Sequence, residues 1–335
     1  MSEGGRRAGD VSSEHGLLWE VLQEASQGGK RFRPRLLTDA HDALGGDQHQ
    51  AAAQVGAAVE LLHTALVVHD DVIDDDHVRR GRPNVSGTYR GLAEVSGADG
   101  ATADGYGQAA AILAGDLALA GAVRAVATCG ADTATTHRLL DLLDTALHVS
   151  AAGELADVRH GLGLATASLQ ESLRVAEQKT AAYSFSLPLQ AGAVLAGADE
   201  DVVAELGEAG RRLGTAFQLV DDLVGVFGDV AASGKSSTGD LRTAKQTPLV
   251  VYARGTHDGQ QIDHYLGRDL DACELAAARD LLTACGARDW VRNRARQELA
   301  AARAVTDPLG ISLSGLGPLT GWDAALPQDD PGAVA

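Results

Sequence analysis

The sequence predicts an all-α fold. Of its 335 residues 45% are hydrophobic but only 4% are aromatic, and much of the hydrophobic content is Ala, a strong helix former. Apolar residues recur with helical spacing along the chain, whereas the alternation typical of strands is almost absent. We therefore expect helices packed around one apolar core.

The most regular helical pattern spans about residues 48–78, where Val55, Val59, Leu62 and Leu66 mark one apolar stripe. Further helices are expected at about residues 17–26, 33–44, 107–128, 134–160, 170–196, 200–227, 241–254 and 275–304. Gly and Pro separate these segments, and residues 91–107 are expected to form the longest Gly-rich loop.

The domain organisation follows from the absence of any shift in composition or any fixed repeat between residues 17 and 313. We expect this range to form a single all-α domain. Residues 1–16 and 314–335 are rich in Gly, Pro, Ser and Asp, so we expect a disordered N-terminal segment and a flexible C-terminal tail.

The charge balance restricts the classes of molecule that the protein can bind. The chain has 46 acidic and 28 basic residues and a net charge of −18, so it would repel nucleic acids and anionic membranes. It has no uninterrupted apolar run long enough for a transmembrane segment. Its three cysteines show no CxxC spacing, which suits a reducing compartment, and we expect a soluble cytoplasmic protein.

The strongest chemical signal is HDDVIDDDHVRRGRPN, which begins at His69. Asp70, Asp71 and Asp74 form a DDxxD motif, and a helix would bring Asp70 and Asp74 to within about 40° of one face. A solvated acidic helix end would give the same bare pattern. The apolar residues around the motif and the following Arg79 and Arg80 favour instead a site for divalent cations and phosphate groups.

A second acidic pair, Asp221 and Asp222, follows an apolar helical stretch and could hold metals together with the first motif. His63 lies seven residues before Asp70, within about 20° of the same helical face. All four lysines lie beside acidic or Gly-rich clusters, where compact ammonium groups suit anions; codon bias is the alternative explanation. These lysines are Lys30, Lys179, Lys235 and Lys245.

Taken together, these motifs resemble the trans-prenyltransferases, the polyprenyl diphosphate synthases. GGKRFRP, ELLHTALVVHDDVIDDDHVRRGRPN, QKT and FQLVDDLVGVFGD followed by GDLRTAKQT occur in the family's order over about residues 17–255. The resemblance implies an isoprenoid-synthase-type helical bundle around a central cavity, usually in a homodimer.

The resemblance also implies roles for individual residues. Asp70, Asp71, Asp74, Asp221 and Asp222 match metal ligands for three magnesium ions. Lys30, Arg33, His63 and Arg80 match positions that bind isopentenyl diphosphate. Positions that match contacts to the allylic diphosphate are Arg79, Lys179, Thr180, Gln218, Lys235 and Lys245.

One position departs from the family pattern. The second motif is often DDxxD, which would place Asp at position 225, but this chain has Gly225. An outer acid is therefore missing, and we expect weaker binding of one metal ion with activity retained.

The implied reaction is the head-to-tail condensation of isopentenyl diphosphate with an allylic diphosphate (dimethylallyl, geranyl or farnesyl), which releases diphosphate. The main alternatives are a class I terpene cyclase and a non-catalytic partner subunit. A cyclase would normally carry (N/D)xx(S/T)xxxE as its second motif, and a partner subunit usually loses aspartates of the first motif.

Product length depends in the family on the residues just before the first motif, where bulky aromatics stop growth at fifteen carbons. Here these positions hold Ala65 and Leu66. One isoprene unit needs about one helical turn of length, so Ala65 is expected to admit a fourth unit. We expect geranylgeranyl diphosphate, with farnesyl or longer products as alternatives.

Overall fold

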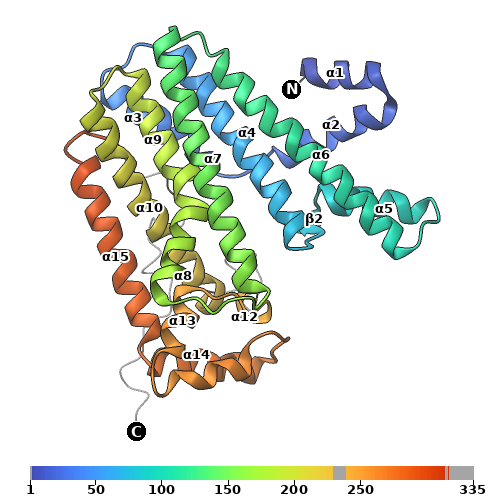
Figure 1. Ribbon diagram of the computed structural model, residues 1–335, viewed down its shortest axis with the longest axis vertical. Coiled ribbons are helices and arrows are strands. Elements are labelled where there is room, and N and C mark those ends of the chain that lie inside the picture. The colour runs from blue at the N-terminus through green and yellow to red at the C-terminus, as the bar shows by residue number, and fades with distance from the viewer. Residues whose placement is uncertain (1, 229–238, 314–315, 317–335) are drawn as a thin grey trace. The chain divides into compact units, whose positions relative to one another are not determined.

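The structure, a computed structural model, describes residues 2–228, 239–313 and 316. These residues form helices and one short hairpin, which confirms the all-α expectation (Figure 1). The chain divides into two compact units, Met1–Thr38 with Asp47–Asp141, and Asp39–Gly46 with Leu142–Ala335. We describe each unit by itself, and the expectation of a single domain stays a prediction.

The first unit holds the N-terminal helices. They are α1 (Ser2–Val11), α2 (Ser13–Ala25), the start of α3 (Phe32–Ala43), α4 (His49–Ile73), α5 (Val85–Val95), α6 (Gly100–Ala127) and the start of α7 (Thr133–Gly161). Between α4 and α5, strand β1 (Val78–Arg79) pairs antiparallel with β2 (Arg82–Pro83).

Small residues bring α4 and α6 close together in the core of the first unit. A Cβ added to Gly115 of α6 would overlap the ring of His69 on α4. Ala65 is fully buried in the same cluster as Ala111 and Ala114 of α6. By length and composition alone, both helices could cross a membrane. Buried core helices meet the same two criteria.

The second unit holds the rest of the chain. Its elements after α7 are α8 (Leu169–Ala176), the π-helix η1 (Glu177–Ser186), α9 (Leu187–Leu195), α10 (Glu200–Phe227), α12 (Gly239–Arg242), α13 (Pro248–Arg254), the 3₁₀-helix η2 (Gly259–Tyr265), α14 (Ala272–Ala284) and α15 (Ala287–Thr306).

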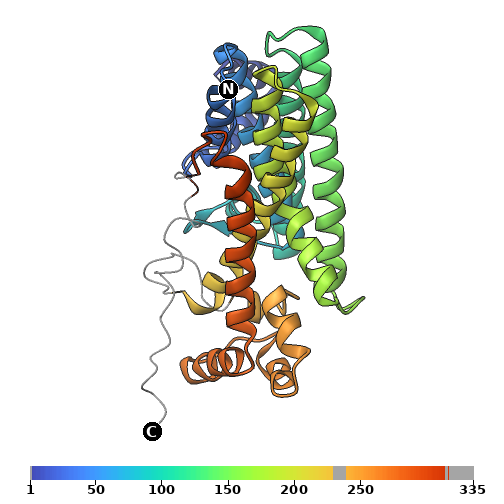
Figure 2. The same ribbon diagram turned by 90° about the vertical axis from the view of Figure 1, so that its left-hand side faces the viewer.

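The long helix α10 is central to the second unit. It packs against η1 and runs beside α15 in both views (Figure 1, Figure 2). Added side chains on Gly210 and Gly214 would overlap η1 at Ser186 and Ala181, so these glycines set how closely α10 approaches the π-helix. This contact positions the side chains of η1 beside those of α10.

Five local expectations differ from the structure. The helix expected at 241–254 is interrupted, because α12 ends at Arg242 and α13 begins only at Pro248. Residues 2–11 form helix α1, where we expected disorder. Helices α5 and α6 cover most of the expected Gly-rich loop at 91–107. The helix expected to reach residue 78 ends at Ile73, and the one expected at 275–304 breaks at Gly286, whose φ is 81°. The C-terminal tail, apart from Leu316, lies outside the described residues.

Candidate active site

The first acidic motif lies at the C-terminal end of α4. Asp70 and Asp71 are in its last turn, and Asp74 is the C-cap residue. Asp71 is only 3% exposed, and burial raises the pKa of its carboxyl although Arg79 opposes that shift. Negative side chains here meet the negative end of the helix dipole, so the location is unfavourable without a nearby cation.

The hairpin after α4 brings such a cation back to the motif. Its two turn residues, Arg80 and Gly81, have φ of 55° and 74°, as a tight hairpin turn requires. The turn directs Arg79 towards α4, where its Nε donates to Asp71 Oδ1 at 2.7 Å and its Nη2 donates to Asp70 Oδ2 at 3.4 Å. Arg79 therefore partly neutralises the first acidic motif.

Arg80 contacts the Gly-rich turn before α3. Its Nη1 donates to the carbonyl of Gln27 at 3.3 Å. Gly28 has φ of 77°, and a Cβ there would lie 3.1 Å from the same Nη1 atom. Glycine thus serves both the backbone conformation and the close approach of the guanidinium group.

Basic side chains surround His63 in the first unit. The pKa of His63 falls to about 2, first because of burial and then because of the positive charges of Arg33, Arg79 and Arg80. The imidazole is therefore neutral at physiological pH. Arg33 is buried against the Phe32 ring, whereas Lys30 is exposed.

In the second unit, two acids of α7 hold Lys179. Its Nζ lies 3.0 Å from Glu154 Oε2 and 2.9 Å from Asp157 Oδ2. Gly153 permits this approach, because a Cβ there would lie 2.5 Å from the backbone nitrogen of Lys179. Sequence reasoning overlooked Glu154, although its spacing of three residues from Asp157 places both acids on one helical face.

A chain of side-chain hydrogen bonds joins η1 to the second acidic motif. Thr180 Oγ1 donates to Gln218 Oε1 at 3.1 Å, and Gln218 Nε2 donates to Asp222 Oδ1 at 3.0 Å. Asp222 is 3% exposed. Burial raises the pKa of its carboxyl well above the ordinary value, and the charges of Asp240 and Asp221 add to this effect.

Lys245 lies in a strained turn that follows α12. Its backbone N–H donates to the carbonyl of Asp240 at 3.0 Å, and the preceding Ala244 has φ of 53°. The next residue, Gln246, accepts from the backbone of Ala167 at 2.8 Å and donates to the carbonyl of His160 at 2.8 Å. Gln246 thus fixes the segment beside Lys245, a role that its neutral side chain does not reveal in the sequence.

The structure brings the predicted residues together in two groups. The first unit holds Lys30, Arg33, His63, Ala65, Leu66, Asp70, Asp71, Asp74, Arg79 and Arg80. The second unit holds Lys179, Thr180, Gln218, Asp221, Asp222 and Lys245. Lys235 lies outside the described residues.

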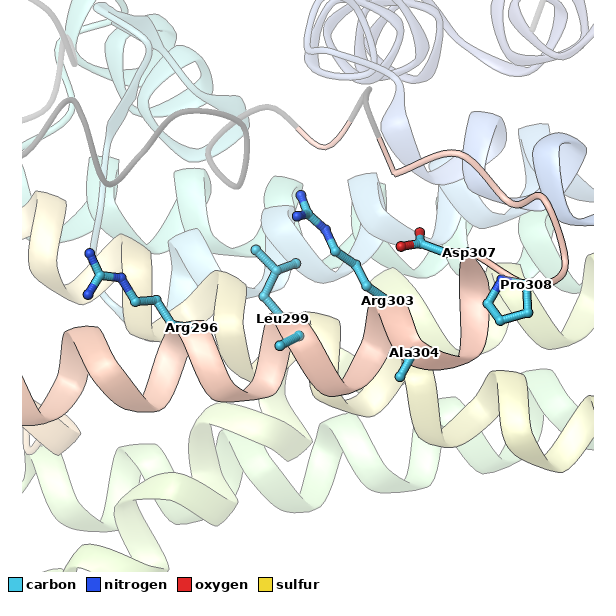
Figure 3. A pocket seen from close by; sticks show the side chains of 7 residues that line it. Arg296, Leu299, Arg303, Ala304, Asp307 and Pro308 are labelled. Carbon is cyan, nitrogen blue, oxygen red and sulfur yellow. The ribbon is translucent and has the colours of Figure 1, made fainter.

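A pocket of about 530 Å³ lies elsewhere, on α15. Figure 3 shows Arg296, Leu299 and Arg303 on one side of the helix, with Asp307 and Pro308 just beyond its end. None of its lining residues belongs to the motifs above, so this pocket is separate from the candidate site.

Comparison with known proteins identifies the family. The sequence model of the polyprenyl synthetase family matches residues 15–281. The geranylgeranyl diphosphate synthase of Saccharolobus solfataricus is 34% identical over 253 residues, covering 73% of this chain and 70% of that protein. The (2E,6E)-farnesyl diphosphate synthase of Mycobacterium tuberculosis is 33% identical over 290 residues, covering 84% of this chain and 75% of that protein.

The structure agrees with this assignment. A crystal structure of geranylgeranyl pyrophosphate synthase from Corynebacterium glutamicum, complexed with isoprenyl diphosphate and magnesium, aligns with a TM-score of 0.84 and 26% identity over 96% of this chain and 93% of that one. Because the family match covers most of the sequence and these enzymes align with most of it, the chain belongs to the polyprenyl synthetase family and is a prenyltransferase.

Proposed function

We propose that this prenyltransferase catalyses the magnesium-dependent condensation of isopentenyl diphosphate with an allylic diphosphate, and that its main product is geranylgeranyl diphosphate. One observation carries the proposal: two acidic motifs each contain a deeply buried aspartate, and each motif has a basic side chain close by, Arg79 at the first and Lys245 at the second. Buried acids of this kind suit a site where metal ions and diphosphate neutralise one another.

The residues present fit magnesium. Carboxylate oxygens are the ligands that this hard cation prefers. Asp222 Oδ2 is buried and accepts no hydrogen bond within the described part of the chain, so it has capacity for a cation. We assign the metal ligands to Asp70, Asp71, Asp74, Asp221 and Asp222, with three ions per site. The ions supply charge neutralisation when the diphosphate leaves.

The protein's own groups bind and orient the two substrates. Lys30, Arg33, neutral His63 and Arg80 bind isopentenyl diphosphate. The groups that bind the allylic diphosphate are Arg79, Lys179, Thr180, Gln218, Lys235 and Lys245. As the allylic C–O bond breaks, these cations stabilise the negative charge on the departing diphosphate. The isopentenyl double bond attacks the allylic carbon, and the released diphosphate accepts the proton that is lost.

The assignment of the product rests on the small side chain at position 65. Ala65 is fully buried and Leu66 is half-buried on α4, and neither is aromatic. Similarity alone leaves length open, because synthases of fifteen-carbon and twenty-carbon products match this chain almost equally well.

We further propose a cytoplasmic homodimer that associates through α6. Four large apolar side chains on α6 are exposed in the monomer: Tyr106, Ile112, Leu113 and Val123. Exposed apolar residues gathered on one helix favour a protein contact.

The deciding experiment incubates purified protein with Mg²⁺, labelled isopentenyl diphosphate and each of the three primers, and then measures product length. We expect a twenty-carbon diphosphate and no turnover after chelation with EDTA. A cyclic hydrocarbon would indicate a terpene cyclase instead. Absence of any product with all primers would overturn the proposed activity and leave a non-catalytic subunit as the better interpretation.

A further inference from the structure

The outer face of α15 is basic although the chain as a whole is acidic. Helix α15 carries five arginines and two acids, whereas the whole chain has a net charge of −18. Its buried acid, Glu298, already pairs with Arg294, whose Nη2 lies 2.6 Å from Glu298 Oε1. Arg296 and Arg303 are exposed and lie on either side of Leu299 in the pocket on this helix (Figure 3). This surface therefore suits an acidic partner.

The pocket offers an apolar floor between its two arginines. Its apolar lining residues are Leu299, Ala300, Ala304 and Pro308. The arginines are two turns apart, about 10 Å along the helix axis, so one aromatic ring can contact the floor and a guanidinium group together. Asp307 also lines the pocket, one turn beyond Arg303. The end of the pocket at Arg296 therefore carries the larger positive charge.

The chain leaves α15 through a turn that reverses its direction. The N–H of Gly310 donates to the carbonyl of Asp307 at 3.0 Å, and Gly310 has φ of 73°. The N–H of Ile311 donates to the carbonyl of Thr306 at 3.1 Å. Two such bonds around a left-handed glycine end a helix and redirect the chain. In Figure 3 the chain beyond Pro308 accordingly turns back along the side of α15 that carries the pocket.

The sequence that follows, residues 317–335, complements this surface. It contains three acids and no basic residue. The acids are Asp323, Asp329 and Asp330. Trp322 directly precedes Asp323, so adjacent positions offer an aromatic ring and a carboxylate. Because the segment is tethered to the same chain, its effective concentration at the pocket is on the order of mM, and weak contacts suffice to hold it.

We propose that residues 317–335 dock on α15 of their own chain, with Trp322 in the pocket and Asp323 paired with Arg296. Docking would cover the exposed apolar floor and order a segment that its composition alone predicts to be flexible. The inference goes beyond the proposed function and does not depend on it, because no residue that lines the pocket belongs to the acidic or basic motifs.

The first test follows Trp322 by ¹⁹F nuclear magnetic resonance. Full-length protein is labelled with 5-fluorotryptophan, and Trp322→Phe identifies the Trp322 signal among the three tryptophans. In the wild type this signal should differ from that of the same label in a free peptide of residues 317–335. Arg296→Glu should move it towards the peptide position and lower the ratio of docked to undocked segment about threefold or more, because attraction becomes repulsion.

The matched control is Arg159→Glu. Arg159 is also an exposed arginine on a long helix, α7, and the substitution changes the net charge equally. The Trp322 signal should not move in this variant. An equal shift in both variants would show a general effect of charge and overturn the docking site.

A charge exchange tests the pairing itself. Asp323→Arg alone should release the segment, and the double variant Arg296→Glu with Asp323→Arg should restore the wild-type position of the Trp322 signal. A double variant no better docked than Arg296→Glu, with both folded by circular dichroism, would overturn the pairing.

Two further outcomes would overturn docking within the chain. One is a wild-type Trp322 signal that coincides with that of the free peptide. The other is a shifted signal that appears only as the protein is concentrated, which would assign the segment on α15 to a second copy.

Discussion

Two aspartates allow the metal assignment to be tested at the scale of single residues. Asp70 lies beside Asp71 in the last turn of α4, and Asp221 precedes the buried Asp222 on α10. Asp70→Ala and Asp221→Ala should each lower turnover by at least about 10²-fold, because a charge-stabilising group is lost. Folding stability should barely change, since repulsion between like charges is relieved. Near-normal kcat/KM in both variants at limiting Mg²⁺ would contradict the assignment.

His63 makes folding stability depend on pH. Its pKa falls from 6.5 to about 2 on folding, so below pH 6.5 the unfolded chain binds more protons than the folded one. The stability contributed by neutral His63 is therefore complete above pH 6.5 and is lost progressively as the pH falls.

We expect this group to reduce the free energy of unfolding by about 1.4 kcal/mol per pH unit well below its ordinary pKa. The free energy of unfolding in urea, measured at about pH 7.5 and about pH 5.5, should fall less for His63→Gln than for the wild type. Equal losses in both proteins would show that His63 is not held neutral.

Product length is also decided by single side chains. Ala65 is fully buried in the core cluster shared by α4 and α6, so Ala65→Phe would overpack it at a cost of about 1–3 kcal/mol. Leu66 is half-buried, and Leu66→Phe is therefore the cleaner variant. Both should shift the product from twenty to fifteen carbons by chromatography, with Tm recorded as the control. Unaltered product length in both variants would show that Ala65 and Leu66 do not limit the length of the product.

At the scale of elements, the close contact between α10 and η1 should make a Gly→Ala substitution in α10 destabilising, which is the opposite of its usual effect in a helix. Gly→Ala within a helix usually stabilises it by up to about 1 kcal/mol. At Gly214, however, the added Cβ would overlap the Cβ of Ala181, so Gly214→Ala should lower the free energy of unfolding by about 1–3 kcal/mol. Gly91→Ala in α5, where nothing lies within 4 Å, should be neutral or stabilising. A stabilised Gly214→Ala variant would contradict this packing.

The positions of most helices could be predicted from the spacing of apolar residues, and the candidate site residues are proposed from the acidic and basic motifs. The expected helix at 200–227 agrees with α10, because its apolar face packs within one unit. The Gly content of residues 91–107 predicts a loop because Gly is a poor helix former, but packing of α5 and α6 on their neighbours outweighs that preference. The site residues stay predictions.

Partners from distant elements could not be predicted in the same way. Glu154 reaches Lys179 across the contact between α7 and η1, and Asp240 of α12 lies beside Gly225 of α10. Such pairings depend on the distance between elements, which spacing within one helix does not contain. The ten-residue π-helix that carries Lys179 and Thr180 likewise has no sequence signal that distinguishes it from an α-helix.

At the scale of the whole molecule, net charge and apolar surface act in opposite directions on self-association. A chain with a charge of −18 repels its own copies, and salt screens that repulsion. On α6, Ile112 and Leu113 are 46% and 56% exposed, and burying them against a second copy would favour a dimer. The dimer should therefore be weakest at low ionic strength and strengthen as salt is added.

Sedimentation of Leu113→Asp tests this balance. The new charge would have to be buried in the interface without a partner, so the variant should sediment as a monomer at concentrations where the wild type is a dimer. Val95→Asp on α5 is the control, since Val95 is 89% exposed and the substitution adds the same charge. A dimeric Leu113→Asp variant would place the interface on another surface. A wild type that stays monomeric in high salt would contradict the dimer itself, because screening removes the only long-range force that opposes it.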